Sequence, residues 1–302
     1  MRIVFMGTPE FAVEPLTRLY TEGYDIAGVF TQPDRAKNRG MKLSFSPVKM
    51  FAMEHEIPVY QPETLRGSEV LDILRGLRCD IIVVVAYGKL LPVEMLQLPP
   101  LGCVNVHASL LPKYRGAAPI QWAVLNGERE TGVTVMYMAD ELDAGDVLYS
   151  RKTTIGDNET AGQLYEKLSI LGAELLCESL DAISGGFAPR EPQKHDEATF
   201  APPLRKDMSP ISWSDSAFNI KCKVRGLNPW PVASAALNGS VFKIFSVDFC
   251  CNETAGEPGT IISAGKHGVE VACGDGSVVI KELQAQGGKR MEAAAYLRGN
   301  PL

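Results

Sequence analysis

Apolar and polar residues alternate along the first hundred residues in blocks that predict strands and helices in turn. The strands are short apolar runs, typical of strands covered on both faces of a sheet, and the helices carry apolar residues at three- and four-residue spacing. The predicted strands are 3–6, 24–31, 57–60 and 80–86, and the predicted helices are 9–22, 46–56 and 68–77. This order predicts a doubly wound, Rossmann-like parallel sheet of the α/β class.

The pattern changes in the second half of the chain. Two more strands are expected at one edge of the sheet, over 134–138 and 146–150, and a long helix over 160–183. The segment 187–204 then has four prolines and no periodicity, which is typical of a linker. After it, five short strand-like runs alternate with glycine-rich turns, which predicts a small, OB-like β-barrel. For a chain of 302 residues we therefore expect an α/β domain at 1–186, a linker at 187–204 and a barrel domain at 205–302.

Composition narrows the possible classes of protein. The chain has no signal-peptide pattern and no apolar run of about 18 residues, so we expect a cytoplasmic protein with no membrane partner. The seven cysteines include no Cys-x-x-Cys pair and the four histidines have no partner at metal-ligand spacing, so we expect no metal. A net charge of -6 argues against a generic nucleic-acid binder, and any RNA contact must use local basic patches. We further expect a monomer.

Two polar residues share one side of a predicted strand end. In GCVNVHASLLPKYRGAAP, over 102–119, Asn105 and His107 are two residues apart and face the same way, and Pro112 prevents the strand from continuing. Such a pair is also common as turn-forming or core polar residues. In parallel α/β sheets, however, this edge binds ligands, and the next strand is expected to deliver an aspartate from 140–146 to the same edge, where it can hold the imidazole.

The segment NVHASLLPKYRGAAPIQWAVLNGERETGVTVMYM, followed by ELDAGDVL, closely resembles the folate-dependent formyltransferases. Their signature is Asn, one residue, His, then Ser-Leu-Leu-Pro, with a distant Leu-Asp-x-Gly, and the resemblance covers nearly the whole chain. It implies that Asn105, His107 and Asp143 are the catalytic residues. Asp143 matches, rather than Asp146, because Leu142 precedes it and a glycine follows two residues later.

The resemblance also implies 10-formyltetrahydrofolate as the co-substrate. The segment that follows the strand at 80–86 would form the pterin pocket, because its backbone groups could hydrogen-bond a flat heterocycle between apolar walls. Residues 140–143 would form the other wall and 109–112 would line the formyl end. The folate-binding residues assigned in this way are Ala86, Tyr87, Gly88, Leu90, Ser109, Leu110, Leu111, Pro112 and Asp140.

A long connection without apolar periodicity, QPDRAKNRGMKL over 32–43, follows the second predicted strand. Its basic residues are predicted to contact the phosphates and bases of an RNA acceptor end, and a solvated surface loop is the alternative. By resemblance, this loop and the domain at 205–302 bind tRNA, and the acceptor is initiator methionyl-tRNA. The family typically has Gly-Arg-Gly-Lys-Lys where this chain has Asn38-Arg39-Gly40-Met41-Lys42, which is one positive charge fewer. The predicted tRNA contacts are Arg35, Lys37, Arg39 and Lys42.

Three other functions are weighed against this one. A sheet of this type often binds a dinucleotide, but the first turn, Gly7-Thr8-Pro9-Glu10-Phe11-Ala12, lacks two glycines of Gly-x-Gly-x-x-Gly. A formyltransferase acting on an amino sugar nucleotide or on glycinamide ribonucleotide would share the catalytic trio but would give the basic loop no task. A non-catalytic RNA-binding protein would need none of the trio.

Overall fold

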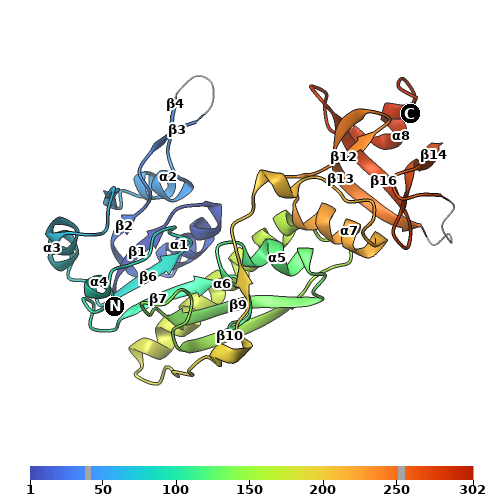
Figure 1. Ribbon diagram of the computed structural model, residues 1–302. Coiled ribbons are helices and arrows are strands. Elements are labelled where there is room, and N and C mark those ends of the chain that lie inside the picture. The colour runs from blue at the N-terminus through green and yellow to red at the C-terminus, as the bar shows by residue number, and fades with distance from the viewer. Residues whose placement is uncertain (38–41, 251–255, 302) are drawn as a thin grey trace. The chain divides into compact units, whose positions relative to one another are not determined.

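The structure is a computed structural model that describes residues 1–37, 42–250 and 256–301 (Figure 1). Its residues form two compact units. The N-terminal unit comprises Met1–Gly116, Thr131–Thr153 and Tyr165–Phe200, and the C-terminal unit comprises Ala117–Glu130, Thr154–Leu164 and Ala201–Leu302. The last of these boundaries falls inside the predicted linker. The two short segments of the C-terminal unit lie before it, in the part of the sequence predicted to be the α/β domain.

A seven-stranded sheet forms the centre of the N-terminal unit, in the order β10-β9-β7-β6-β1-β2-β5. Neighbouring strands are parallel from β7 to β5, whereas β9 is antiparallel to β7. This arrangement confirms the predicted doubly wound α/β sheet with two further strands at one edge. The strands are β1 (Arg2–Gly7), β2 (Asp25–Phe30), β5 (Val59–Tyr60), β6 (Ile81–Val85), β7 (Cys103–His107), β9 (Glu130–Tyr137) and β10 (Val147–Thr154).

Helices cover both faces of this sheet, because successive residues of a strand point to opposite sides. On one face, side chains of β1 and β6 share an apolar core with α3 and α4. On the other, Phe11 packs edge-to-face on Tyr165 of α6, with ring centroids 5.2 Å apart, and Gly172 of α6 lies against Val106 of β7. In the described part of the chain, no helix is long and apolar enough to cross a membrane. The helices named here and below are α1 (Val13–Thr21), α2 (Pro47–Glu54), α3 (Ser68–Leu77), α4 (Val93–Leu96) and α6 (Ala161–Ser184).

The start of the first helix differs from the expected one. Thr8 directly precedes the predicted helix at 9–22, where a threonine would be a favoured cap, but it does not cap that helix. The backbone stays extended through Pro9, so a 3-10 turn (Glu10–Ala12) precedes α1, and the Thr8 hydroxyl instead donates a hydrogen bond to the carbonyl of Tyr87 at 3.0 Å. Thr8 thereby ties the turn after β1 to the turn after β6.

An antiparallel sheet in the order β12-β13-β16-β15-β14 forms the centre of the C-terminal unit, and β17 pairs with β16. The five predicted strands, expected over 233–237, 241–249, 259–263, 269–272 and 278–283, occur within two residues of these positions. Asn238 and Gly239 connect the first two with φ of 45° and 80°, as the predicted two-residue hairpin turn requires. Among the strands that the structure describes, β14 does not pair with β12, so no closed barrel is seen. The strands are β12 (Ala233–Leu237), β13 (Ser240–Cys250), β14 (Ile261–Gly265), β15 (Gly268–Cys273), β16 (Gly276–Ala285) and β17 (Met291–Glu292).

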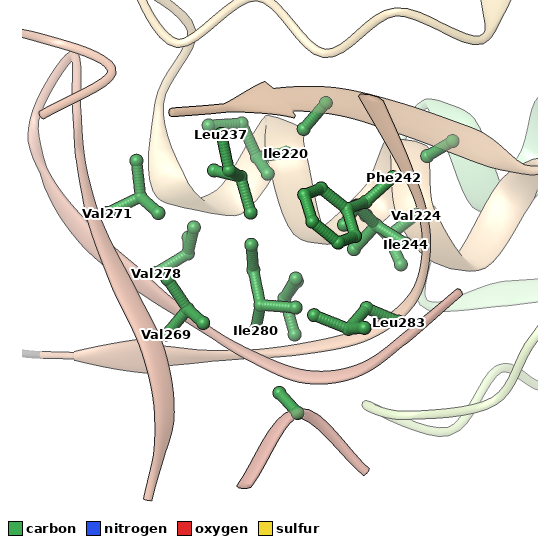
Figure 2. Close-up of a cluster of buried hydrophobic side chains, with 14 of the residues drawn as sticks. Ile220, Val224, Leu237, Phe242, Ile244, Val269, Val271, Val278, Ile280 and Leu283 are labelled. Carbon is green, nitrogen blue, oxygen red and sulfur yellow. The ribbon is translucent and has the colours of Figure 1, made fainter. Parts of the chain in front are cut away.

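The core of the C-terminal unit lies between this sheet and helix α7 (Ala217–Gly226), as Figure 2 shows. Phe242, Ile244 and Ile280 from the strands meet Ile220 and Val224 from the helix, and all five are at most 1% exposed. The remaining elements are α5 (Pro119–Leu125), which packs beside α7, the short helix α8 (Ala293–Leu297), the 3-10 turns η2 (His195–Glu197) and η3 (Lys206–Met208), and the short strands β8 (Arg115–Gly116) and β11 (Phe200–Ala201).

Candidate active site

The strand β7 ends at His107, where the sequence predicts it to stop. The chain then turns, and the Ser109 hydroxyl donates a hydrogen bond to the carbonyl of Lys113 at 2.6 Å. Thr134 of β9 fastens the same turn: its hydroxyl donates to the carbonyl of Ser109 at 2.7 Å and accepts from the N–H of Leu111 at 3.2 Å. These bonds fix the backbone of 109–112, the segment predicted to line the formyl end of the folate pocket.

Asn105 and His107 are both nearly buried, with 9% and 5% of their surface exposed. His107 Nε2 lies 2.9 Å from the carbonyl oxygen of Tyr114. A carbonyl only accepts hydrogen bonds, so this contact assigns a proton to Nε2 and leaves Nδ1 for chemistry. Among the described residues, the side-chain amide of Asn105 has no hydrogen-bond partner, which leaves its N–H groups available to a ligand.

Asp143 lies beside His107. Its Oδ2 is 3.7 Å from His107 Nδ1 and accepts a hydrogen bond from the N–H of Gly116 at 2.8 Å. The first distance is too long for a hydrogen bond but lies within ion-pair range once Nδ1 carries a proton. The Asp143 side chain is 13% exposed, so water screens this pair only weakly. The three residues predicted to be catalytic thus include a carboxylate–imidazole pair at a sheet edge.

Asp143 reaches His107 by a different route from the expected one. From the sequence, the neighbouring strand is expected to deliver the aspartate to the edge where β7 ends. In fact β9 is antiparallel to β7, and its last residue, Tyr137, pairs with Val104 near the start of β7. The loop after β9 must therefore run back toward His107. A loop, rather than the order of strands, positions this carboxylate.

Three non-glycine residues around this site adopt the left-handed backbone conformation. They are Ala86, Tyr114 and Asp143, with φ of 47°, 61° and 50°. Each such residue costs about 1–3 kcal/mol and persists where the surroundings hold it, which is common at functional sites. For Tyr114 the holding contact is a hydrogen bond from its N–H to Thr199 Oγ1 at 2.9 Å. The strained backbone therefore marks the same place as the polar side chains.

The segment after β6 presents some of its predicted folate contacts to the surface and buries another. Ala86 and Gly88 are exposed, and Leu90 exposes 70% of its surface. Asp140, in the loop after β9, is exposed as well. The ring of Tyr87 instead lies in the core of the N-terminal unit, where burial raises the pKa of its phenol to about 12. Its carbonyl accepts from Gln32 Nε2 at 3.1 Å. Only the backbone of Tyr87 can therefore face a pocket.

The predicted tRNA loop is built on a two-stranded hairpin, β3 (Arg35–Lys37) and β4 (Lys42–Ser44). Its register pairs Lys37 with Lys42, so two basic residues share one position of the ladder. Arg39 lies outside the described residues. Below the hairpin, Asp34 is bound by Lys49 Nζ at 2.5 Å and by Gln61 Nε2 at 2.8 Å, and these contacts hold the pKa of the Asp34 carboxyl below its usual value. The hairpin thus leaves the sheet from a fixed base.

Sequence reasoning missed four residues that hold the site together: Tyr114, Arg115, Thr134 and Gln193. Tyr114 and Arg115 stand in the quoted motif segment, but the sequence does not indicate their roles, because one acts through its main-chain carbonyl and the other through a buried side chain. Gln193 is a single polar residue in a proline-rich segment, and no local pattern distinguishes it. In the described ranges, no three His, Cys, Asp or Glu side chains gather in a way that could hold a metal ion.

The comparison with known families gives two matches that cover most of the chain. The sequence profile described as "Formyl transferase" matches residues 1–180, and the profile described as "Formyl transferase, C-terminal domain" matches residues 203–301. The methionyl-tRNA formyltransferase of Trichlorobacter lovleyi is 49% identical over 301 residues, which are 100% of this chain and 95% of that protein. The methionyl-tRNA formyltransferase of Clostridioides difficile is 47% identical over 302 residues, 100% of this chain and 98% of that protein.

Solved structures share the fold at lower identity. WlaRD, a sugar 3N-formyl transferase whose crystal structure was determined in the presence of dTDP and 5-N-formyl-THF, has a TM-score of 0.69 and 19% identity over 94% of this chain and 97% of that one. HypX from Aquifex aeolicus, solved in complex with tetrahydrofolic acid, has a TM-score of 0.64 and 21% identity, over 98% of this chain and 47% of that one. This chain therefore spans about half the length of HypX.

Proposed function

Because this chain belongs to the formyl transferase family, we propose that it transfers a formyl group from 10-formyltetrahydrofolate to the α-amino group of initiator methionyl-tRNA. The observation that carries the proposal is the His107–Asp143 pair at the end of β7, with the unpartnered amide of Asn105 two residues before His107 on the same strand. The similarity to methionyl-tRNA formyltransferases, 47–49% identity over nearly the whole chain, supports the choice of acceptor. The product would serve the initiation of protein synthesis.

Asn105 and His107 would stabilise the oxygen of the transferred group. Attack of the α-amine on the formyl carbon makes that carbon tetrahedral and places negative charge on its oxygen. The amide of Asn105 and the Nδ1–H of a protonated His107 would donate hydrogen bonds to this oxygen, since Nε2 is already bound to the carbonyl of Tyr114. Losing one donor of this kind commonly costs about 2.7–4 kcal/mol of transition-state stabilisation.

The Asp143 carboxylate would take up the amine proton through a water, because both ring nitrogens of a protonated His107 already carry one. The amine loses a proton during the attack and the departing folate nitrogen gains one, so a nearby group must hold a proton between these events. The Oδ2 of Asp143 lies 3.7 Å from Nδ1 and can balance the charge of the imidazolium. Its bond from Gly116 keeps this oxygen turned toward His107.

Transfer would be direct, without a covalent enzyme intermediate. Cys103 is the cysteine of β7 and stands two residues before Asn105. Burial raises the pKa of its thiol to about 12, so the thiolate that a nucleophilic cysteine needs is scarce at neutral pH. Its Sγ also lies 3.8 Å from the carbonyl of Met95, in the apolar core that the sheet shares with α4. Ser109 is equally unsuited, because its hydroxyl is buried and already bonded.

The residues present fit a folate. Leu90 and Leu142 expose 70% and 49% of their surface on the two segments predicted to wall the pocket, where apolar atoms would suit a flat heterocycle. The exposed backbone at Ala86 and Gly88 offers hydrogen-bonding groups to its edge. When bound, the folate supplies the activated formyl group. The assignments of Ser109, Leu110, Leu111, Pro112 and Asp140 to this pocket rest on the resemblance to the folate-dependent formyltransferases.

The basic hairpin favours a tRNA acceptor over a sugar nucleotide. Arg35, Lys37, Arg39 and Lys42 would meet the acceptor end of the RNA, a task that a small acceptor would not require. The structural similarity to WlaRD is a similarity of fold and is compatible with either acceptor. Charged initiator tRNA is made where translation occurs, so the proposed reaction would place a bacterial protein in the cytoplasm. We also propose that the protein acts as a monomer and needs no metal.

The direct test is a single incubation of the purified protein with 10-formyltetrahydrofolate and charged initiator tRNA, scored for formyl-methionine on the RNA. Elongator methionyl-tRNA, free methionine and a dTDP-amino sugar are the parallel acceptors. We expect formylation of the initiator tRNA alone. Formylation of the amino sugar, with none on tRNA, would overturn the choice of acceptor, and folded, folate-binding protein that formylates nothing would overturn the proposal.

A further inference from the structure

We infer that Gln193 is a positioning residue that holds the Asp143 loop in its working place, and that Arg115 sets the orientation of Gln193. The inference deepens the proposed function and rests on it. Gln193 belongs to the segment predicted to be a linker, yet its side chain is only 7% exposed. It lies within the N-terminal unit, as does every contact used here.

Gln193 binds the two ends of the turn that carries Asp143. Its Nε2 donates to the carbonyl of Asp143 at 2.9 Å and to the carbonyl of Gly145 at 2.8 Å. Both N–H bonds of the amide are thereby used on one loop. Since this loop has to run back from the far end of β7 and carries Asp143 in the left-handed region, its backbone needs such an anchor.

Arg115 decides which way the glutamine amide points. Its Nε and Nη2 lie 3.2 Å and 2.7 Å from Gln193 Oε1. A guanidinium only donates, so Oε1 must face Arg115 and Nε2 must face the loop. Arg115 is 5% exposed, and no ion pair to it is found in the described part of the chain; its Nη1 lies 3.5 Å from His195 Nδ1. A buried cation bonded to neutral groups therefore fixes the amide.

The same chain segment also supports the other half of the catalytic pair. Thr199 Oγ1 accepts a hydrogen bond from the N–H of Tyr114 at 2.9 Å. The carbonyl of Thr199 accepts one from the N–H of Arg115 at 2.8 Å. Tyr114 in turn presents its carbonyl to His107 Nε2. Residues 193–199 thus bind both Tyr114, whose carbonyl holds His107, and the loop that carries Asp143. In this way they set the 3.7 Å separation between His107 Nδ1 and Asp143 Oδ2.

The sharpest test is Gln193→Glu in the full chain. The carboxylate keeps the size of the side chain and its contact with Arg115 but cannot donate to the carbonyls of Asp143 and Gly145. We expect kcat to fall about 10²-fold, because a shift near 1 Å in a catalytic group costs about that much. The KM values for folate and tRNA should stay within about twofold, since no binding contact is lost. Gln97→Glu makes the same charge change at the exposed residue that directly follows α4 and should leave kcat unchanged.

A second set of variants separates positioning from general damage. If Gln193 acts through Asp143, adding Gln193→Glu to the Asp143→Asn variant should lower the single-turnover rate by less than about twofold relative to Asp143→Asn alone. Equal losses in both backgrounds, or a loss that follows a lower thermal midpoint, would overturn the inference. If Gln193→Glu does not fold, Arg115→Lys, which frees the amide to rotate, should show the same non-additivity with Asp143→Asn.

The outcomes also distinguish this inference from the proposed function. A wild-type kcat for Asp143→Asn would refute the catalytic role of Asp143 and remove the premise. An inactive Asp143→Asn together with a fully active Gln193→Glu would leave the proposed function standing and refute the positioning role alone.

Discussion

The N-terminal and C-terminal units use their polar residues in opposite ways. Around the end of β7, polar side chains such as His107, Arg115 and Gln193 are each at most 7% exposed and bonded to specific partners. On the C-terminal sheet, charged side chains remain in water and pair locally, as Arg290 does with Glu282 and Lys281 with Asp248. The first arrangement fixes atoms for a reaction, whereas the second covers an apolar core.

This contrast predicts how substitutions should behave in the two units. A buried polar network has few interchangeable members, so removing one leaves others without partners and the effect is steep. Exposed ion pairs are screened, and removing one has little effect. Activity should therefore fall sharply when residues at the end of β7 are changed. In the C-terminal unit, only substitutions in the core should have a large effect, and that effect should be on stability.

The largest effect is expected for His107→Ala. The variant loses an oxyanion donor and the cation that faces Asp143, and kcat should fall about 10³–10⁴-fold. Single-turnover formylation of initiator tRNA measures this loss. Thermal unfolding and tRNA binding should stay close to wild type, and a fall of tRNA affinity in step with activity would show instead that His107 holds the fold or the RNA. Asp143→Ala should behave in the same way.

In the C-terminal unit, the comparable effect is one on stability. Phe242 is 1% exposed at the centre of the core, and Phe242→Ala should cost about 3–5 kcal/mol in the free energy of unfolding. Val241, the preceding residue of β13, is 58% exposed, and Val241→Ala is the matched control with a much smaller cost. Denaturant unfolding followed by tryptophan fluorescence would measure both. Equal costs would mean that β13 does not divide into a buried and an exposed face.

The fold was largely predictable because apolar periodicity reports burial. The strands β1, β2 and β6 and the helix α6 lie close to their expected residues, and Asn238-Gly239 marks its hairpin because both residues accept positive φ. Thr8 shows the limit of local signals. Threonine is a favoured cap residue, but whether the Thr8 hydroxyl caps a helix or donates to the Tyr87 carbonyl depends on a turn 79 residues away in sequence.

The site was predictable where its residues stand in a family motif and hidden where other side chains support those residues. Asn105, His107 and Asp143 stand in a recognisable motif, and the structure brings His107 and Asp143 within 3.7 Å. The direction of β9 could not be read from its residues, so the path of the Asp143 loop was expected wrongly. Gln193 and Arg115 are 78 residues apart, and nothing in either local sequence indicates that one orients the other.

A smaller effect is expected for Arg39→Ala. This variant tests whether the hairpin contributes to the reaction site or only to tRNA binding. Loss of one charge-assisted phosphate contact should raise the KM for tRNA about tenfold and lower the salt dependence of binding by about one unit of slope. Folate binding should not change. Arg66→Ala removes the same charge at an exposed residue and should be neutral. Equal damage to folate and tRNA binding would make Arg39 structural.

The smallest effect is expected for Arg290→Ala on the C-terminal sheet. The Arg290 side chain is 50% exposed and its charge is already balanced by Glu282, so the pair should contribute less than about 1 kcal/mol to stability. For the same reason it attracts a phosphate only weakly, and the KM for tRNA should change by less than about twofold. Glu282→Ala and the double variant complete the cycle. If Arg290→Ala instead raises the KM tenfold while Glu282→Ala lowers it, the C-terminal sheet grips RNA through this arginine, and the contrast between a chemical unit and a passively charged one fails.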